Sequence, residues 1–189
     1  MKNIKTVNKI SIIGGSGTGK STLARNLSKE LNIEFYHIDA IHHLENWKIR
    51  DKEERDSIIY DIVSKDKWII DGTYKDTLVK RMEEADIIIY LDYSTIARVK
   101  GILTRYLKSK GKERPDIPGC KERMNFNFLK FVVTWKKKKR KQINENIKYV
   151  QENNKKSENN FLIFKNRKKL NKWYKNEFNK KIETMIKYL

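Results

Sequence analysis

The sequence predicts an α/β fold with a five-stranded parallel sheet and helices on both of its faces. Three observations support this prediction. Short apolar runs of strand type alternate with segments of helical periodicity, a glycine-rich stretch joins the first run to the first helix, and three of the runs end at an aspartate. Right-handed crossovers between parallel strands place the connecting helices on the two faces of the sheet.

The first half of the chain supplies four of the strands. They are expected at residues 10–13, 34–38, 67–70 and 86–91, each a short apolar run that ends at glycine or aspartate. The helix after the first strand is amphipathic, because its apolar residues recur at helical spacing at Leu23, Ala24, Leu27 and Leu31.

Capping residues predict where the next three helices begin. Asp51 and Glu54 have the spacing of a capping box. Thr73 and Asp76 are candidate caps of a short helix that ends near residue 84, and Ser94 or Thr95 is expected to cap the helix after it. That helix is expected to turn six side chains inward: Ile96, Val99, Ile102, Leu103, Tyr106 and Leu107.

The second half of the chain begins with a break in this alternation. Residues 108–120 are polar and contain two glycines and two prolines, so we expect a mobile, lid-like flap. A long helix should follow at 121–152, then a polar loop at 153–160 and the fifth strand at 161–164. A basic amphipathic helix is expected within 166–189, with an apolar face made of Leu170, Trp173, Tyr174, Phe178, Ile182 and Ile186.

Length and composition narrow the class of protein. A chain of 189 residues suits a single domain, residues 1–189, with the flap as an insert. No apolar run approaches the roughly 20 residues of a membrane span, and the N-terminal residues lack the apolar segment of a signal peptide, so we expect no membrane partner. The single cysteine, Cys120, excludes an internal disulfide, which fits a cytoplasmic protein. The net charge of +19 fits either a solvated basic face or a site for a polyanion such as nucleic acid.

The glycine-rich stretch carries the strongest functional signal. It fits the phosphate-binding pattern G-x-x-x-x-G-K-[ST] and lies between a strand and a helix, as the pattern requires. Glycines let the backbone N–H groups surround a phosphate chain, the lysine reaches the β and γ phosphates, and the serine hydroxyl holds Mg²⁺. The sequence therefore predicts ATP and Mg²⁺ as cofactors, with the nucleotide bound by Gly14, Gly15, Ser16, Gly17, Thr18, Gly19, Lys20, Ser21 and Thr22.

Other residues complete a candidate phosphoryl-transfer site. A second acidic group beside Ser21 should hold the metal's water shell, and both Asp71 and Asp92 end apolar strands. Gly72 leaves space for a phosphate next to Asp71, which favours that residue. Asp39 ends the second strand and is a candidate for orienting the acceptor hydroxyl.

The flap contributes cations. Arg105 lies at its root and Arg114 within it, and arginine suits bidentate phosphate contact. Such a flap could close over the phosphates and exclude water. The acceptor is expected to bind between Asp39, the histidine–tryptophan loop at residues 42–47, and Arg81. His37, His42 and His43 do not have the spacing of a zinc site.

Several segments together resemble the bacterial DNA topology modulation protein family, a branch of the adenylate-kinase-like P-loop proteins. The resemblance covers the chain from the first strand to about residue 123, and its most specific part is Arg114-Pro115-Asp116 through Gly119-Cys120. The other matching segments are 12–24, 37–40, 68–74 and 81–92.

The resemblance implies a three-layer P-loop NTPase fold with sheet order 2-3-1-4-5 and a lid insert. It also implies that Asp71 is the metal-side acid and that Arg105 and Arg114 contact the transferring phosphate. This chain departs from the family at Ser94-Thr95, where Pro-Arg is common, and at Gly101, where an arginine is usual. Arg98 is a candidate substitute for that arginine.

Two functions follow as hypotheses. The first is an ATP- and Mg²⁺-dependent phosphotransferase that acts on a nucleoside, nucleotide or similar small acceptor. The alternative is a nucleotide-dependent nucleic-acid-binding protein that affects DNA topology, which would use the basic block 136–141 beside Trp135. The long helix and the C-terminal helix could also form a dimer surface, so a monomer and a homodimer both stay open.

Overall fold

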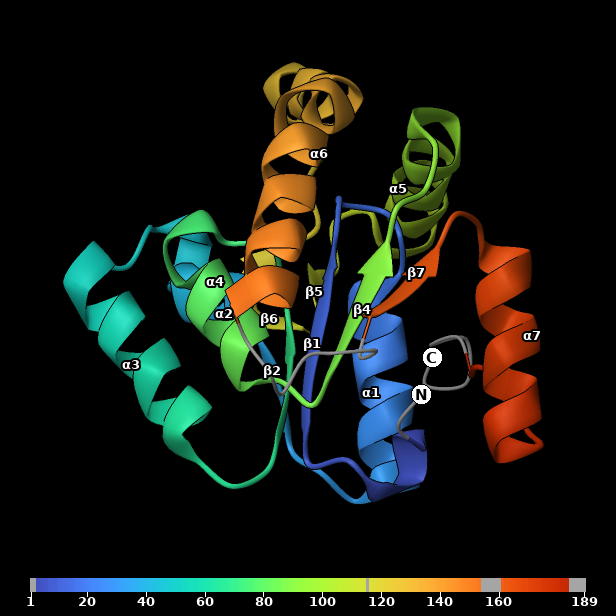
Figure 1. Cartoon of the computed structure of the whole chain (residues 1–189). Helices are drawn as coiled ribbons and strands as arrows, with labels where there is room; N and C mark the ends of the chain where they lie inside the picture. The colour runs from blue at the N-terminus through green and yellow to red at the C-terminus, as the bar shows by residue number, and fades with distance from the viewer. Residues whose placement is uncertain (1–2, 115, 154–160, 184–189) are drawn as a thin grey trace.

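A computed structural model of the chain describes residues 3–114, 116–153 and 161–183. At its centre is a five-stranded parallel sheet in the order β2-β3-β1-β4-β7 (Figure 1). Counted among the parallel strands, this is the predicted order 2-3-1-4-5. The strands are β1 Lys9–Gly14, β2 Phe35–His37, β3 Trp68–Asp71, β4 Ile87–Leu91 and β7 Phe161–Phe164.

The three central strands are buried on both faces. In β3 and β4 every residue is buried, and in β1 only Lys9 is partly exposed. Such continuous apolar runs are typical of parallel sheets that helices cover on both sides. Ile10 of β1 is in register with Ile69 on one side and Ile87 on the other, so the isoleucines of three strands form one layer.

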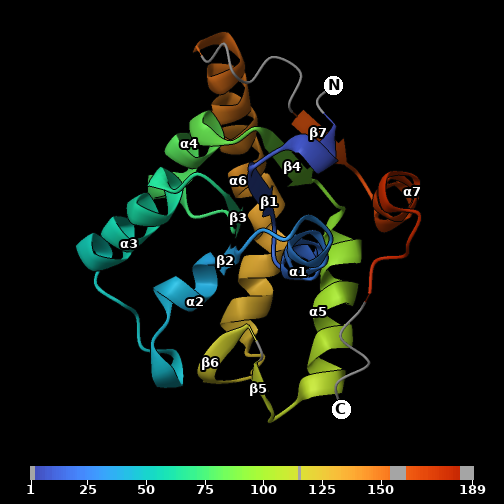
Figure 2. The same cartoon turned by 90° about the horizontal axis from the view of Figure 1, so that it is seen from below.

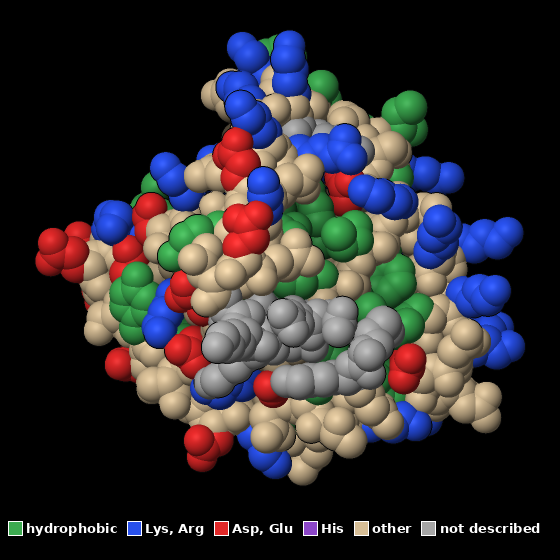
Figure 3. Space-filling model, viewed as in Figure 1, with side chains coloured by type: hydrophobic (Ala, Val, Ile, Leu, Met, Phe, Trp, Pro, Cys, Tyr) green, Lys and Arg blue, Asp and Glu red, His purple; other side chains and the backbone are tan. Residues whose placement is uncertain are grey.

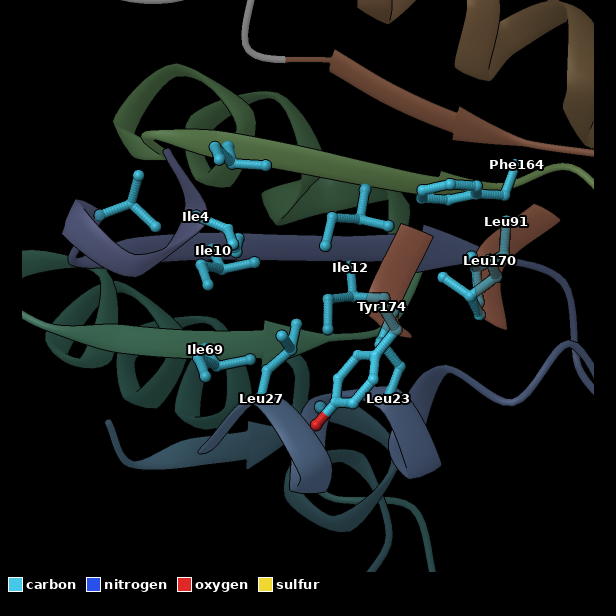
Figure 4. Packing of buried hydrophobic residues seen from close by; sticks show 14 of the residues in the cluster. Ile4, Ile10, Ile12, Leu23, Leu27, Ile69, Leu91, Phe164, Leu170 and Tyr174 are labelled. Atoms are coloured by element: carbon cyan, nitrogen blue, oxygen red, sulfur yellow. The ribbon is translucent and has the colours of Figure 1, made fainter. Parts of the chain in front are cut away.

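Helices cover both faces of the sheet and complete the predicted three layers (Figures 1 and 2). On one face, α1 (Lys20–Leu31) and α7 (Arg167–Phe178) pack through residues such as Leu23, Leu27 and Leu170, which Figure 4 shows around Ile10 and Ile12. The other face packs against α3 (Lys52–Ser64), α4 (Lys75–Glu84) and α6 (Phe126–Asn153). The remaining helices are α5 (Thr95–Ser109) and the short α2 (Ile38–His42), with 3₁₀ turns η1 at Ile4–Thr6 and η2 at Glu45–Trp47.

The helix caps confirm two predictions and correct one. Asp51 caps α3 by accepting from the backbone N–H groups of Glu53 and Glu54, although the Glu54 carboxylate pairs with Arg50 and does not close the box. Ser94 caps α5. The prediction of Thr73 or Asp76 as the cap of α4 is wrong, because α4 begins after Tyr74 without a side-chain cap. The Thr73 hydroxyl is engaged elsewhere, as described below.

The predicted inward face of α5 is wrong at three positions. Ile96, Leu103 and Leu107 are 82%, 40% and 78% exposed, and the buried residues of the helix are Arg98 and Ile102. The reason is the surface on which α5 packs. The helix lies against the phosphate-binding loop, and a Cβ at Gly101 would come within 2.1 Å of the Gly17 carbonyl oxygen. The contact face therefore carries glycine and arginine, which a search for apolar periodicity does not select.

Most of the expected flap is folded as a β-hairpin. Strands β5 (Glu113–Arg114) and β6 (Ile117–Lys121) pair antiparallel, and the side chains of Ile117 and Cys120 are fully buried. Strand β6 packs on η2, so the hairpin is attached to the segment that follows β2.

The long helix forms as α6, but it begins at Phe126 and not at residue 121, because Lys121 belongs to β6. The prediction that the C-terminal helix continues through Ile182 is wrong, because α7 ends at Phe178, where the next residue, Asn179, is left-handed. In α6 the apolar stripe Val132, Trp135, Ile143, Ile147 and Val150 is buried. Helix α7 buries Leu170 and Tyr174, and Ile182 packs on the same core. Of the loop predicted at 153–160, Asn153 is the last residue of α6, and residues 154–160 lie outside the described residues, as does Ile186. On the face shown in Figure 3, lysine and arginine side chains gather toward the top and the right-hand edge, where Figure 1 places α6 and α7.

Among the described residues, no helix has the length and apolar character needed to span a membrane.

Candidate active site

The phosphate-binding loop runs from the end of β1 at Gly14 to the start of α1 at Lys20. Two of its glycines are required by close approach as well as by a positive φ. A Cβ at Gly14 would lie 2.7 Å from the Leu91 carbonyl oxygen, and one at Gly17 would lie 2.2 Å from that of Arg98. Within the loop, Gly15 O accepts from the Thr18 hydroxyl at 2.9 Å and from Lys20 Nζ at 3.3 Å. The loop is thus closed on itself, with the lysine folded over it.

Lys20 is surrounded by the other charged residues of the site. Burial lowers its pKa, and the nearby charges of Arg105 and Arg98 act in the same direction, whereas Asp71 and Asp39 raise it; the net shift is downward. Asp71 and Asp39 are two of the residues that the sequence predicts for the phosphoryl-transfer site. A polyphosphate entering here would meet an ammonium group that has already lost much of its water.

Thr73 fixes the start of the loop. Its hydroxyl accepts from the Gly14 N–H and donates to the Gly14 carbonyl, both at 2.9 Å. This contact links the turn after β3 to the end of β1. It explains why Thr73 does not cap α4, and its role could not be read from local sequence because the partner lies 59 residues away.

Asp71 and Asp92 have different surroundings, which separates the two candidates for the metal-side acid. Asp71 is fully buried and its Oδ2 accepts from the Ser21 hydroxyl at 2.7 Å. Asp92 Oδ2 instead contacts Lys165 Nζ at 2.7 Å and Arg140 Nη2 at 3.3 Å. Only the Asp71 carboxylate faces the loop together with Ser21. A hydroxyl and a carboxylate are the hard oxygen donors that Mg²⁺ prefers.

His37 is a site residue that the sequence analysis did not select. Its Nδ1 lies 2.5 Å from Asp71 Oδ1, and its Nε2 lies 3.7 Å from Asp39 Oδ2. Burial lowers the pKa of His37, but the Asp71 carboxylate and then Asp39 raise it, and the net shift is upward. The signal for this contact is the strand register, in which His37 pairs with Asp71, and register is not visible in a single strand.

Asp39 lies in the first turn of α2, one residue beyond the expected strand. Burial raises the pKa of its carboxyl, but the side chain is 53% exposed, so the surrounding cations decide the direction. The charges of His37, Lys20 and Arg114 lower this pKa. Asp39 is therefore ionised at neutral pH and close to both the loop lysine and the hairpin arginine.

The two predicted arginines are brought together by Glu122, which follows β6. Arg105 Nη2 donates to Glu122 Oε1 at 3.1 Å, and Arg114 Nε lies 3.8 Å from Oε2. Burial and then the charge of Arg105 lower the pKa of Arg114. The sequence analysis missed Glu122, because nothing local distinguishes it from the other acids of a charged chain.

Arg98, the candidate substitute for a lid arginine, packs against the phosphate-binding loop. Its guanidinium is buried beneath the loop, where Nη2 donates to Val132 O at 2.9 Å and Nε to Ser16 O at 3.4 Å. It also lies over the Trp135 ring, 4.6 Å from the centroid. Arg98 thus connects the loop to α6 from its position on α5.

The expected acceptor region is lined by aromatic rings. Tyr74, His42, His43 and Trp47 form a chain of ring contacts with centroids 4.6–5.2 Å apart. Arg81, which was expected beside it, is fully buried and donates to the carbonyls of Gly72 and Tyr74. Burial lowers the pKa of Arg81 to about 9. Arg81 therefore holds the turn after β3 and does not line the acceptor region.

A pocket of about 100 Å³ flanks the other side of the loop. It lies between the N-terminal turn of α1 and helix α7. Its lining combines loop and helix residues: Thr18, Gly19, Thr22, Leu23, Arg167, Leu170, Asn171 and Ile182. Thr22, predicted as a nucleotide contact, therefore faces a space that continues away from the phosphate loop.

Sequence comparison gives one family match. The family described as ATPase family associated with various cellular activities (AAA) matches residues 10–92. The matched stretch begins in β1 and ends just after β4, so it contains the loop, Thr73 and Asp71. No curated protein matches the chain.

Comparison with solved structures finds partial similarity to several kinases. Shikimate kinase from Bacteroides thetaiotaomicron is 17% identical, with a TM-score of 0.47 over 78% of this chain and 98% of that one. A gluconokinase from Sinorhizobium meliloti 1021 is 14% identical, with a TM-score of 0.49 over 91% and 90%. Shikimate kinase from Acinetobacter baumannii, in complex with shikimate, is 15% identical, with a TM-score of 0.43 over 75% and 97%.

The strand order, the loop and the family match agree. The chain has an α/β fold with a five-stranded parallel sheet, and the phosphate-binding motif lies at the carboxyl end of β1. The closer resemblance to the DNA topology modulation family stays a prediction.

Proposed function

We propose that the protein is a phosphotransferase that uses ATP and Mg²⁺ and transfers the γ-phosphoryl group to a hydroxyl of a nucleoside, nucleotide or similar small acceptor. The observation that carries this proposal is that five charged groups gather around the phosphate-binding loop: Lys20, Asp71, Asp39, Arg105 of α5 and Arg114 of the hairpin. A protein that only binds a nucleotide needs the loop but has no use for cations and a carboxylate opposite it.

The donor half is the loop and the pocket beside it. The backbone N–H groups of residues 14–22 and Lys20 would hold the polyphosphate, with the positive end of α1 pointing at it. The pocket between α1 and α7 would accept the rest of the nucleotide, because it opens from Thr22 and is lined by both polar and apolar side chains.

The pair Ser21 and Asp71 would hold the metal and its water shell. When bound, Mg²⁺ neutralises charge on the phosphate oxygens. Their hydrogen bond at 2.7 Å keeps the two oxygen donors together, and His37 fixes the other carboxylate oxygen of Asp71. This support leaves Asp71 little freedom to turn away from the loop.

The acceptor half is Asp39 with the aromatic region behind it. The acceptor oxygen would attack the γ-phosphorus while its proton passes to Asp39, and the bond between the γ-phosphorus and the bridging oxygen would break to release ADP. Because cations lower the pKa of Asp39, it is a weak base. Its main contribution would therefore be orientation of the hydroxyl, as expected for a loose transition state in which the proton moves late.

The proposal is tested by measuring ADP formation with Mg²⁺ and ATP across a panel of nucleosides, nucleoside monophosphates, polyols and sugar acids. At least one acceptor should raise turnover well above the rate with water, and Lys20→Ala should abolish it. The control Lys29→Ala removes an exposed lysine from the far end of α1 and should leave the rate unchanged. Background rates across the whole panel, from protein that binds ATP, would contradict the proposal.

One observation favours a second function, nucleic-acid binding. A groove of about 220 Å³ runs along α6, and it combines three lysines with two aromatic rings: Asn127, Lys130, Phe131, Thr134, Trp135, Lys138 and Lys139. The basic block has no aromatic residue within it in the sequence, but the helix turns Phe131 and Trp135 to the same side as these lysines. Lys130, Lys138 and Lys139 form no ion pair with the described residues.

Single-stranded DNA is the probe for this second function. Binding should weaken steeply with salt, and replacing Lys130, Lys138 and Lys139 by glutamine should reduce the salt dependence. The matched control replaces Lys141 and Lys148, which pair with Glu145 and Glu152 on the same helix. Equal loss in both variants, or binding that is insensitive to salt, would reject a site in the groove.

A further inference from the structure

Glu122 connects Arg105 of α5 to Arg114 of the hairpin. Its side chain is 2% exposed, and its backbone N–H donates to Lys112 O at 2.8 Å, so the residue is fixed at the base of the hairpin. Arg105 comes from α5 and Arg114 from β5. One buried carboxylate therefore joins a helix and both sides of the hairpin.

The contact with Arg105 has two parts. Nη2 donates to Oε1 at 3.1 Å, while Nε lies 2.9 Å from Oε2 in a charge contact that is not aligned as a hydrogen bond. Arg114 lies farther away, with Nε 3.8 Å from Oε2. Arg105 thus keeps Nη1, and Arg114 keeps both terminal nitrogens, without a hydrogen-bonding partner among the described residues.

The two arginines come from elements that pack against the two halves of the site: α5 lies on the phosphate-binding loop at Gly101, and the hairpin contacts α2 and η2 through β6. The charge of Arg105 reaches Lys20 and lowers its pKa, and the charge of Arg114 reaches Asp39 and lowers its pKa. A buried carboxylate is costly unless it is paired, so its presence here calls for a reason beyond packing. The hairpin already has a strand pair and the buried side chains of Ile117 and Cys120 to stabilise it.

We infer that Glu122 is a positioning residue: it orients Arg105 and Arg114 so that their free N–H groups converge on the γ-phosphate between the loop and Asp39. This inference rests on the proposed phosphotransferase function. A carboxylate that fixes the Nε side of a guanidinium leaves the opposite side of the planar fork exposed, and a pre-oriented fork loses less entropy when it binds a phosphate. Glu122 could instead compete with the phosphate for the two arginines. In that case its removal should strengthen binding of the γ-phosphate group, whereas the positioning role predicts weaker binding.

The experiment measures the dissociation constants of the full chain for Mg²⁺–ADP and for Mg²⁺ with the non-hydrolysable ATP analogue AMP-PNP. The ratio of the two constants reports contacts to the γ-phosphate, and general damage to the fold cancels in it. Wild type should prefer AMP-PNP by about tenfold or more, as expected for charge-assisted contacts. Glu122→Gln keeps the volume but removes the charge, and its ratio should fall close to one while ADP affinity changes little.

A second variant separates orientation from charge. Glu122→Asp keeps the carboxylate but moves it away from both arginines, so it should lose the preference for AMP-PNP as Glu122→Gln does; if Glu122→Gln fails to fold, this variant decides. Glu113→Gln is the matched control, because Glu113 lies in the same hairpin and bonds only to the Gly119 N–H among the contacts described. It should keep the wild-type ratio.

Four results would overturn the inference. If the ratio of the dissociation constant for ADP to that for AMP-PNP is unchanged in both Glu122 variants, Glu122 does not position the arginines. If this ratio is larger in both variants, Glu122 holds the arginines away from the phosphate. A wild-type ratio near one would show that they do not reach the γ-phosphate. Wild-type protein that binds neither nucleotide would reject the proposed function itself, which is a distinct outcome.

Discussion

Ser21 at the start of α1 and Asp71 at the end of β3 are joined by a hydrogen bond of 2.7 Å, although 50 residues separate them in the chain. The contact exists because β1 and β3 are neighbours in the sheet, so the loop after one and the last residue of the other meet at the same edge. Ligands of open α/β sheets bind at this edge.

Replacing either aspartate should have separable effects. Asp71→Asn should remove the Mg²⁺ dependence of ATP affinity and lower turnover by about 100-fold or more. The reason is that the substitution replaces the charged carboxylate on the metal side by a neutral amide. Asp92→Asn should leave the Mg²⁺ dependence intact and destabilise the fold by about 2 kcal/mol, since Asp92 is buried against Lys165 and Arg140. Calorimetric titration with ATP and urea unfolding distinguish the two; equal loss of Mg²⁺ dependence in both variants would contradict the assignment.

Gly101→Ala should weaken ATP binding although Gly101 is not in the loop. Its added Cβ would lie 2.1 Å from the Gly17 carbonyl oxygen, so α5 and the loop must separate. Without this contact, replacing glycine by alanine in a helix should raise the free energy of unfolding by about 1 kcal/mol. A lower free energy of unfolding would therefore indicate the clash with the loop. The control Gly111→Ala meets no atom within 4 Å but has a φ of +73°, so it should cost stability without altering ATP affinity. A stabilised Gly101→Ala protein with normal ATP binding would show that the contact is slack.

Thr73→Val should loosen the start of the phosphate-binding loop. The substitution keeps the shape but removes the hydroxyl that bonds to the Gly14 N–H and carbonyl. We expect a loss of about 1–2 kcal/mol in unfolding free energy and weaker ATP binding, because a partly buried N–H is left without its partner. Thr73→Ser retains the hydroxyl and should behave like wild type in thermal-shift titrations with ATP; a loss as large as that of the valine variant would point to packing instead.

His42 gives a pH dependence with a definite sign. Burial lowers its pKa, and the charges of His43 and Arg55 lower it further, so the folded pKa lies below the ordinary value of 6.5. The unfolded chain therefore binds the proton more readily. The stability contributed by neutral His42 is present above about pH 6.5 and is lost as the pH falls through 6.5 toward the folded pKa.

The check is a pair of urea unfolding series at about pH 7 and about pH 5. His42→Gln cannot titrate, so its stability relative to wild type should rise as the pH falls. A constant difference between the two proteins at both pH values would contradict a lowered pKa.

Much of the fold follows from local sequence, and the exceptions share a physical cause. Strands such as β4 are recognisable because a buried parallel strand is apolar throughout. The contacts of His37 with Asp71 and of Glu122 with Arg105 were not predictable, because each depends on strand register or on packing between distant elements. The face of α5 was mispredicted for a related reason: it packs on a loop backbone, which selects Gly101 and Arg98 over apolar side chains.

The position of β7 also bears on how the chain can fold during synthesis. This strand is the last of the five to leave the ribosome, yet it pairs with β4, which was completed some seventy residues earlier. Until β7 arrives, the isoleucine-rich β4 is an open edge, the kind of surface on which nascent chains aggregate. The two cations that contact the Asp92 carboxylate, Arg140 and Lys165, are likewise synthesised after it. A chain cut before Phe161 should therefore depend on chaperones for solubility even though its phosphate-binding loop is complete.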